Sequence, residues 1–332
     1  MKNAALLFVI LVSSCSAPTW VKNQKIGNAF GTTYSIIYLT DKEVDFDREI
    51  DSVIEVVNQS MSTYIPNSDI SKINDGDSTV AVDSMFKEVF ELSTRVHKAS
   101  DGFFDPTIGV LANAWGFGPG KQVELDSTKV DSLLKFVGWN KVSLNTDKTI
   151  TKKYPEIRFD FNAIAKGYAI DRLGTMLTKK GIDNYLVEVG GEVLTKGVNT
   201  ISKKDWTVGI DNPKNVLQRG RAGVLRLKDK ALASSGNYRK FRIDSETGEK
   251  YVHTINPKTG YTKNSKVLAA SVIAADCATA DAYATTFMAL DLKKSKELLA
   301  QRTDLDAYII YLGENDSIQR YLTPGFEKVL LK

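Results

Sequence analysis

The chain has 332 residues, of which 42% are hydrophobic and 25% are charged. This balance is ordinary for a globular protein, and it excludes a disordered chain or a protein with many membrane spans. The formal net charge is only +4, and lysine and arginine are scattered along the chain. That pattern excludes the basic patch of a nucleic-acid binder, so we expect no nucleic acid among its partners.

The first fifteen residues have the parts of an export signal. Lys2 is positive, residues 4–12 are apolar, and small residues precede a cysteine in Val12-Ser13-Ser14-Cys15. The apolar run is too short to span a bilayer, and the sequence around Cys15 resembles the lipobox of bacterial lipoproteins, whose cysteine is lipidated after cleavage. We therefore expect a signal peptide at 1–15 with Cys15 as the lipidation site. A cleaved signal in which Cys15 has no role is the alternative.

Both interpretations export the protein, and a lipid on Cys15 would anchor it to a bacterial membrane, facing the periplasm. The only other cysteine is Cys277. If Cys15 carries lipid, no intramolecular disulfide can form, and stability must come from core packing.

The predicted elements begin after a short tether at 16–25, and the folded unit is expected to span 26–332. Alternating side chains predict a strand at 31–39. Apolar residues three and four positions apart predict helices in three stretches, namely 44–61, from the cap Asp83 to the turn at Ser100-Asp101-Gly102, and 127–137.

The second half begins with a predicted helix at 163–180, which Gly181 ends, followed by a buried strand at 185–189. Further strands are expected at 206–210, 224–227, 231–234, 251–255 and 267–274, then helices at 278–290 and 293–302, and strands at 307–312 and 318–322. Because strands occur in runs and helices in runs, the pattern indicates the α+β class. No Pro, Gly or Ser-rich linker divides the unit, although two lobes remain open at this length.

The segment Asp160-Phe161-Asn162-Ala163-Ile164-Ala165-Lys166-Gly167 places an acid, an amide and a lysine at the start of a predicted helix. Free backbone N–H groups and the positive end of the helix dipole favour an anion there, and a phosphate would suit the position. The alternative is that Asp160 or Asn162 is a helix cap and Lys166 a solvated surface residue.

Asp281 and Thr285 are four residues apart on a predicted helix and therefore share one face. A carboxylate and a hydroxyl are hard oxygen donors that suit Mg²⁺, which proteins often hold with one or two carboxylates while substrate phosphates and water complete the shell. The same spacing also occurs on ordinary polar helix faces, so this pair is weak evidence alone.

Two further stretches combine turn residues with groups that can contact a flat ring or move a proton. The stretch 99–109 has two aromatic rings and an acid within a turn, although a purely structural turn is the alternative. Of the two histidines, His97 lies among apolar neighbours on a predicted helix, where a structural role fits. His253 ends a predicted strand beside a turn and is the better candidate for a general base.

Taken in order, these segments resemble the ApbE family of FAD:protein FMN transferases over nearly all of the mature chain. The resemblance rests on Gly31-Thr32, Met61-Ser62-Thr63-Tyr64 with Ser68, Ile70 and Asn74, Asp101 to Thr107, Asp160 to Gly167, Glu188-Val189-Gly190-Gly191-Glu192, Ser235-Gly236-Asn237-Tyr238, His253-Thr254-Ile255-Asn256-Pro257 and Ala280 to Thr285. It implies a single catalytic unit with mixed or antiparallel sheets flanked by helices.

The resemblance also implies a set of site residues. The Ala163 carbonyl, Asp281 and Thr285 would hold Mg²⁺, and His253, Lys166 and Asp281 would be catalytic. The implied flavin contacts are Phe30, Tyr64, Phe103, Phe104, Asp105, Asp160, Lys166 and Ile255.

By this resemblance the substrate is FAD, and a Ser or Thr hydroxyl of an acceptor protein attacks the FMN phosphorus while AMP departs. Acceptors of similar enzymes carry a motif like Ser/Thr-Gly-Ala-Thr/Ser and are subunits of redox complexes or exported flavoproteins. Two rival functions remain, an FAD pyrophosphatase that uses water in place of the acceptor, and a lipoprotein that binds FAD without chemistry.

Overall fold

The computed structural model describes residues 20–211, 221–237, 241–243, 250–262 and 265–331. Cys15, residues 16–19 of the expected tether and Tyr238 lie outside the described residues. No helix in the described ranges is long and apolar enough to cross a membrane.

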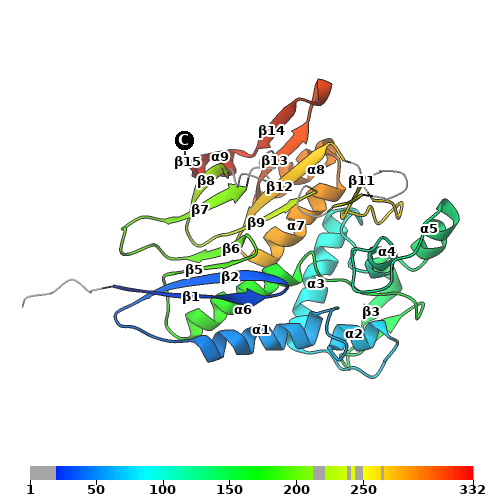
Figure 1. Cartoon of the computed structure of the whole chain (residues 1–332), viewed down its shortest axis with the longest axis horizontal. Coiled ribbons are helices and arrows are strands. Elements are labelled where there is room, and N and C mark those ends of the chain that lie inside the picture. Colours follow the sequence, from blue (N-terminus) through cyan, green and yellow to red (C-terminus); the bar gives the residue numbers. More distant parts are fainter. Residues whose placement is uncertain (1–19, 212–220, 238–240, 244–249, 263–264, 332) are drawn as a thin grey trace, which may run out of the picture.

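One antiparallel sheet of eight strands is the centre of the fold (Figure 1). Its strands, in spatial order, are β1 (Val21–Ala29), β2 (Thr32–Thr40), β5 (Tyr185–Val189), β6 (Glu192–Lys196), β9 (Ala231–Gly236), β12 (Val267–Ala274), β13 (Asp306–Leu312) and β14 (Ile318–Leu322). Every strand pair in it is antiparallel, which confirms the α+β class.

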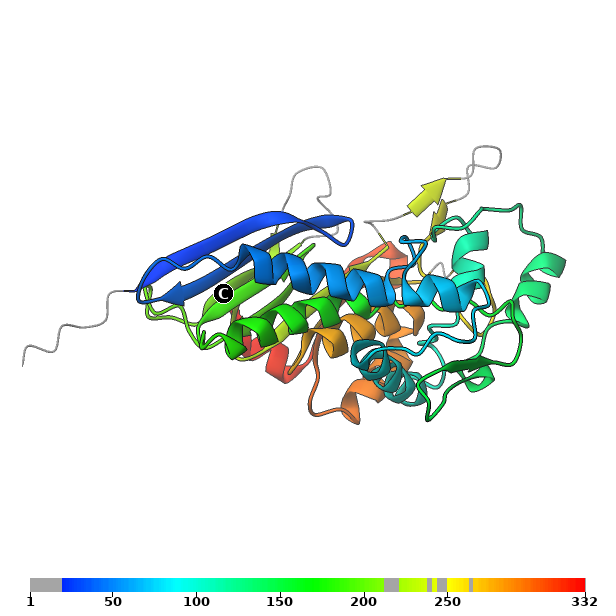
Figure 2. The same cartoon turned by 90° about the horizontal axis from the view of Figure 1, so that it is seen from below.

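The described helices are distributed unevenly about this sheet. They are α1 (Asp47–Met61), α2 (Asp69–Asn74), α3 (Ser84–Ala99), α4 (Gly109–Ala114), α5 (Ser127–Leu134), α6 (Ala165–Lys179), α7 (Cys277–Ala289), α8 (Leu292–Ala300) and α9 (Pro324–Val329). Figures 1 and 2 show α1, α6 and α7 side by side below the sheet, with α9 on the other side. The start of α6 and the middle and end of α7 lie near the loops on one side of the molecule.

Three smaller sheets occur in the part of the chain that the structure describes. They are β15-β8-β7, made of Leu330–Leu331, Arg221–Leu227 and Trp206–Asp211, and the hairpins β3-β4 (Val142–Leu144 and Ile150–Lys152) and β10-β11 (Phe241–Ile243 and Lys250–Val252). The short 3-10 helices η1 and η2 span Trp139–Lys141 and Glu314–Asp316. The hairpin β10-β11 ends immediately before His253.

Strand β12 is buried on both faces because it lies between two parts of the core. Ala270 and Val272 face the main cluster with α3, α6 and α7, whereas Ala269 and Ile273 face a cluster formed with β7, β8 and α9. Both faces are therefore mainly apolar, and the sequence is apolar at every position except Ser271 instead of alternating. A separate small cluster around Leu111 and Val130 packs α4 and α5 together.

The expected tether at 16–25 is too long at its C-terminal end. Strand β1 begins at Val21 and pairs with β2 over its whole length, from Val21 opposite Thr40 to Ala29 opposite Thr32. It is an edge strand with mostly polar side chains and only two buried positions. The usual apolar signal is therefore weak, and the strand is indistinguishable from a polar linker in the sequence alone.

Candidate active site

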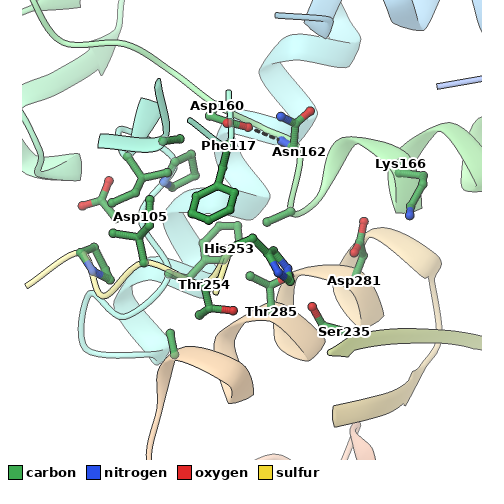
Figure 3. A pocket seen from close by; sticks show the side chains of 18 of the residues that line it. Asp105, Phe117, Asp160, Asn162, Lys166, Ser235, His253, Thr254, Asp281 and Thr285 are labelled. Atoms are coloured by element: carbon green, nitrogen blue, oxygen red, sulfur yellow. Dashed lines mark hydrogen bonds between the residues drawn. The ribbon is translucent and has the colours of Figure 1, made fainter. Parts of the chain in front are cut away.

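A cavity of about 290 Å³ opens between the start of α6, the middle of α7, the end of β9 and two loops. Its lining includes nearly all of the predicted site residues, namely Tyr64, Phe103, Phe104, Asp105, Asp160, Ala163, Lys166, His253, Ile255, Asp281 and Thr285. Figure 3 shows the labelled members of this set arranged around one hollow. Segments more than 200 residues apart in the sequence therefore meet in one place.

Phe30 is not among the described residues that line this cavity. It lies in the turn between β1 and β2 with a positive φ of 52°, and its half-buried side chain packs against the hydrophobic core. The flavin contact that the resemblance implies for Phe30 stays a prediction, and in this structure the ring packs against the core beside Gly31.

The segment before α6 is held by a buried amide on α2. The Asn74 side chain donates to the Phe159 carbonyl at 2.9 Å and accepts from the Phe159 N–H at 2.6 Å. The next residue, Asp160, donates its N–H to the Pro106 carbonyl at 2.8 Å and accepts from the Asn162 N–H at 2.7 Å. Asp160 thus stabilises the turn that leads to α6, whereas the helix itself begins after Ile164 without a side-chain cap.

A carboxylate from α7 takes the place of that missing cap. Asp281 accepts a hydrogen bond from the Gly167 N–H at 3.1 Å, in the first turn of α6, where backbone N–H groups have no partner within the helix. Burial raises the pKa of the Asp281 carboxyl, and the nearby Lys166 and the Gly167 N–H oppose that shift. Asp281 is only 6% exposed, so its charged form requires positive partners in the cavity.

Lys166 supplies one positive charge at this position. Its Nζ lies 2.8 Å from a carboxylate oxygen of Glu192, which is buried at the start of β6. Glu192 follows the tight turn Gly190-Gly191, where both glycines have positive φ values of 61° and 102°. Figure 3 shows Lys166 and Asp281 pointing into the same part of the cavity from two different helices.

The oxygen donors at this position suit a hard cation such as Mg²⁺. Asp281 and Thr285 both line the cavity from α7, one helical turn apart, and Ala163 lines it just before α6. In the described ranges no group of three or more His, Cys, Asp or Glu side chains could hold a metal. A cation here would therefore depend on one carboxylate, a hydroxyl, a carbonyl and oxygens from a ligand, which is a common arrangement for magnesium bound to phosphates.

The turn at 100–107 is held mainly by Asp105 and His97. Asp105 Oδ1 accepts from the N–H and hydroxyl of Thr107 at 2.9 and 2.6 Å, and Oδ2 accepts from the Trp139 N–H at 3.0 Å. His97 Nδ1 lies 2.9 Å from the Phe104 carbonyl, which fits its expected structural role. Although Asp105 lines the cavity, both of its oxygens already have partners within the protein.

Two lysines lie close to the ring of Phe103 at the cavity wall. The Nζ atoms of Lys258 and Lys294 are 4.7 and 4.8 Å from the ring centroid, within the range of cation–π attraction. Lys258 also pairs with Asp101 at 2.6 Å. These contacts bring positive charge to the wall of the site.

His253 follows β11 and lines the cavity together with Thr285 (Figure 3). The next residue, Thr254, is buried and donates its hydroxyl to the Asn237 side chain at 2.8 Å. This bond ties the segment that carries His253 to the end of β9, so the imidazole is presented by a supported backbone.

Several cavity residues were absent from the predicted set, and the polar or aromatic ones include Phe117, Asn162, Glu192 and Ser235. The last three lie inside segments that the sequence had already marked. Phe117 lies in Gly116-Phe117-Gly118-Pro119-Gly120. An aromatic residue among turn-forming glycine and proline residues could have been marked from the sequence as a candidate ring contact. Its ring faces the hollow in Figure 3.

Comparison with known proteins gives a consistent picture. The model of the ApbE family matches residues 30–309. An FAD:protein FMN transferase of Haemophilus influenzae is 31% identical over 95% of this chain and 94% of its own length, and one of Vibrio cholerae is 31% identical over the whole of both chains. The solved structure of the flavin transferase ApbE from Vibrio cholerae superposes with a TM-score of 0.82 at 29% identity, covering 94% of this chain and all of that one.

Proposed function

This chain belongs to the ApbE family and is an FAD:protein FMN transferase, and from that premise we propose that the transfer is magnesium-dependent and directed to a Ser or Thr hydroxyl. The observation that supports this most directly is the buried Asp281 carboxylate beside Thr285, Ala163 and Lys166 in one cavity. A buried acid whose pKa is raised by desolvation gains from a nearby cation, and a pyrophosphate is the ligand that such a cation and Lys166 would attract together.

The proposed reaction exchanges one phosphorus–oxygen bond for another. The acceptor hydroxyl oxygen bonds to the FMN phosphorus, the bond from that phosphorus to the bridging oxygen breaks, and AMP leaves with the bridging oxygen. His253 takes the hydroxyl proton, because it is the histidine that lines the cavity. Lys166 stabilises negative charge on the pyrophosphate and on the departing AMP.

When bound, magnesium would draw electron density from the pyrophosphate oxygens and make the phosphorus easier to attack. Asp281, Thr285 and the Ala163 carbonyl are the groups that would hold it. The aromatic side chains of Tyr64, Phe103 and Phe104 would contact the flat rings of FAD, and Asp160 would lie at the edge of that contact.

The acceptor and the place of the reaction follow from the resemblance and the N-terminus. We propose that acceptors present a motif like Ser/Thr-Gly-Ala-Thr/Ser, and that Cys15 anchors the enzyme by lipid to a bacterial membrane on the periplasmic side. An exported enzyme would meet redox-complex subunits or exported flavoproteins there.

One incubation tests the central proposal. The purified protein is mixed with FAD, Mg²⁺ and an acceptor protein that carries the motif, and the acceptor is weighed by mass spectrometry. We expect a gain equal to FMN that disappears with EDTA and when the motif hydroxyl is replaced by alanine. Free FMN and AMP with an unchanged acceptor would select the pyrophosphatase, and unchanged FAD would select a binding protein.

A further inference from the structure

Asp171 is a half-buried acid on α6 that the proposed reaction does not use. It lies one helical turn after Gly167, outside the lining of the active-site cavity, and borders a separate cavity between α3, α6 and the start of α7. Its two oxygens accept hydrogen bonds from the first two backbone N–H groups of α7, Cys277 at 2.7 Å and Ala278 at 2.8 Å. A carboxylate from one helix therefore caps the start of another.

Each of the two helices supplies a carboxyl group that accepts hydrogen bonds from the first turn of the other. Asp171 of α6 satisfies N–H groups in the first turn of α7, and Asp281 of α7 satisfies the Gly167 N–H in the first turn of α6. Those groups have no partners within their own helices, and each carries part of the positive end of a helix dipole. When the carboxylates are ionised, both contacts are charge-assisted bonds across the same helix crossing.

The crossing is close because it contains glycine. A Cβ atom at Gly167 would lie 2.4 Å from the Cys277 carbonyl oxygen and 2.9 Å from the Ala278 Cα. The residues that Asp171 binds are therefore the same residues that pack against Gly167, whose N–H binds Asp281. A shift of the α7 start relative to α6 would move the Asp281 carboxylate relative to Gly167 and Lys166.

We propose that Asp171 is a positioning residue for the active site: it fixes the start of α7 on α6, and so sets where the Asp281 carboxylate stands in the cavity. The inference deepens the proposed function and rests on it for the link to magnesium. Some residues orient a metal-binding side chain without binding the metal themselves. Their replacement commonly lowers metal affinity or activity by about 10-fold to 100-fold.

Asp276 provides a matched comparison on the same helix. It is the N-cap of α7, and its side chain accepts from the Thr279 N–H at 2.8 Å. Asp276 therefore stabilises the same first turn as Asp171, but this cap bond stays within its own helix and leaves the two bonds from Asp171 in place. Asp276→Ala should weaken α7 without releasing it from α6.

The experiment compares the wild type, Asp171→Asn and Asp276→Ala, each purified as the full folded chain. In Asp171→Asn one acceptor oxygen becomes an NH₂ group that cannot receive an N–H. Three quantities are measured: the Mg²⁺ concentration that half-saturates FMN transfer, the rise in Tm on adding Mg²⁺ with FAD, and amide hydrogen exchange in peptides from the start of α6 and of α7.

For Asp171→Asn we expect about a tenfold higher half-saturating Mg²⁺ concentration, a smaller rise in Tm with the ligands, and faster exchange at the start of both helices. For Asp276→Ala we expect a lower Tm and faster exchange at the start of α7 alone, with magnesium dependence within twofold of wild type. If Asp171→Asn fails to fold, Asp171→Glu keeps both acceptor oxygens but displaces them by one methylene, and the same expectations apply.

Magnesium dependence and α6 exchange like those of wild type in the folded Asp171 variant would overturn the positioning role. So would equal changes in both Asp171 and Asp276 variants, since that result would reflect general loss of α7 stability. A wild-type protein that transfers FMN without magnesium would instead refute the metal part of the proposed function, and the exchange data would still decide whether Asp171 holds the two helices together.

Discussion

The Gly167 N–H of α6 donates to the Asp281 carboxylate of α7, a residue 114 positions away in the sequence. This bond links the segment that was expected to receive a phosphate to the carboxylate that was expected to hold a cation. It exists because glycine at 167 lets α6 approach the backbone of α7. The geometry of the proposed active site therefore depends on a position that has no side chain.

Gly167→Ala should destabilise the protein and separate the two helices. The new Cβ would lie within 3 Å of three backbone atoms of Cys277 and Ala278, which cannot turn away as a flexible side chain can. Overpacking of this kind costs about 1–3 kcal/mol of unfolding free energy. Denaturant unfolding measures the loss, and Lys179→Ala in the last turn of α6 is the control. Unchanged stability in Gly167→Ala would mean that the helices can part without cost.

Asp281→Asn should remove FMN transfer while the fold is kept. The asparagine oxygen can still accept from the Gly167 N–H, but the negative charge that would attract Mg²⁺ is lost. Replacing a residue that only orients a metal ligand typically lowers activity by up to about 100-fold. We expect a larger loss of transfer for Asp281→Asn, with Tm near that of wild type in the absence of ligands. Asp276→Asn is the control, because asparagine is also a good N-cap. Full transfer by Asp281→Asn would remove Asp281 from the metal site.

Much of the fold could be predicted because several elements have strong signals at both ends. Helix α3 begins after Asp83, whose side chain accepts from the Phe86 N–H as expected of a cap, and strand β12 matches its predicted limits. Strand β1 was missed because its polar edge position removes the apolar pattern. Helix α2 was missed because six residues are too few to show helical periodicity.

The sequence could predict which segments form the active site, but not how their side chains lie relative to one another. Lys166 and Asp281 were marked by residue type and by the family resemblance, yet only the packing of α6 on α7 shows that they share a cavity. Asp171 gave no signal, since one acid on an amphipathic helix usually faces water. Its partial burial and its bond to the Cys277 N–H depend on a long-range helix crossing, and neither spacing nor composition records such a contact.

His253→Asn should slow the chemical step without weakening FAD binding. Asparagine keeps a polar side chain of similar reach but cannot accept a proton, and loss of a general base typically lowers a rate about 10²-fold to 10⁴-fold. Single-turnover transfer measures the rate, and FAD titration in the absence of acceptor measures binding. His97→Asn is the comparison, and it should lower Tm because His97 supports the Phe104 carbonyl. A His253 variant with a normal transfer rate would exclude this histidine as the base.

Asp171 should make the protein less stable as pH rises from about 4 to 7. Burial raises the pKa of this carboxyl to about 7, helped by the nearby Asp276 and Asp281 and opposed by the Cys277 and Ala278 N–H groups. Between its ordinary pKa and that value, the folded state keeps a proton that the unfolded state has released. Unfolding free energy therefore falls with rising pH, by at most about 1.4 kcal/mol per pH unit from this group.

The check is denaturant unfolding at several pH values from 4.5 to 8 for the wild type and Asp171→Asn. Asparagine does not titrate, so the difference in unfolding free energy between the two proteins should change steadily up to about pH 7 and then level off. Asp183→Asn, on the loop before β5, should run parallel to wild type. A constant difference in unfolding free energy between wild type and Asp171→Asn over this range would show that Asp171 is ionised in the folded protein throughout. In that case the two hydrogen bonds from the start of α7 would stabilise the charged form by more than burial destabilises it.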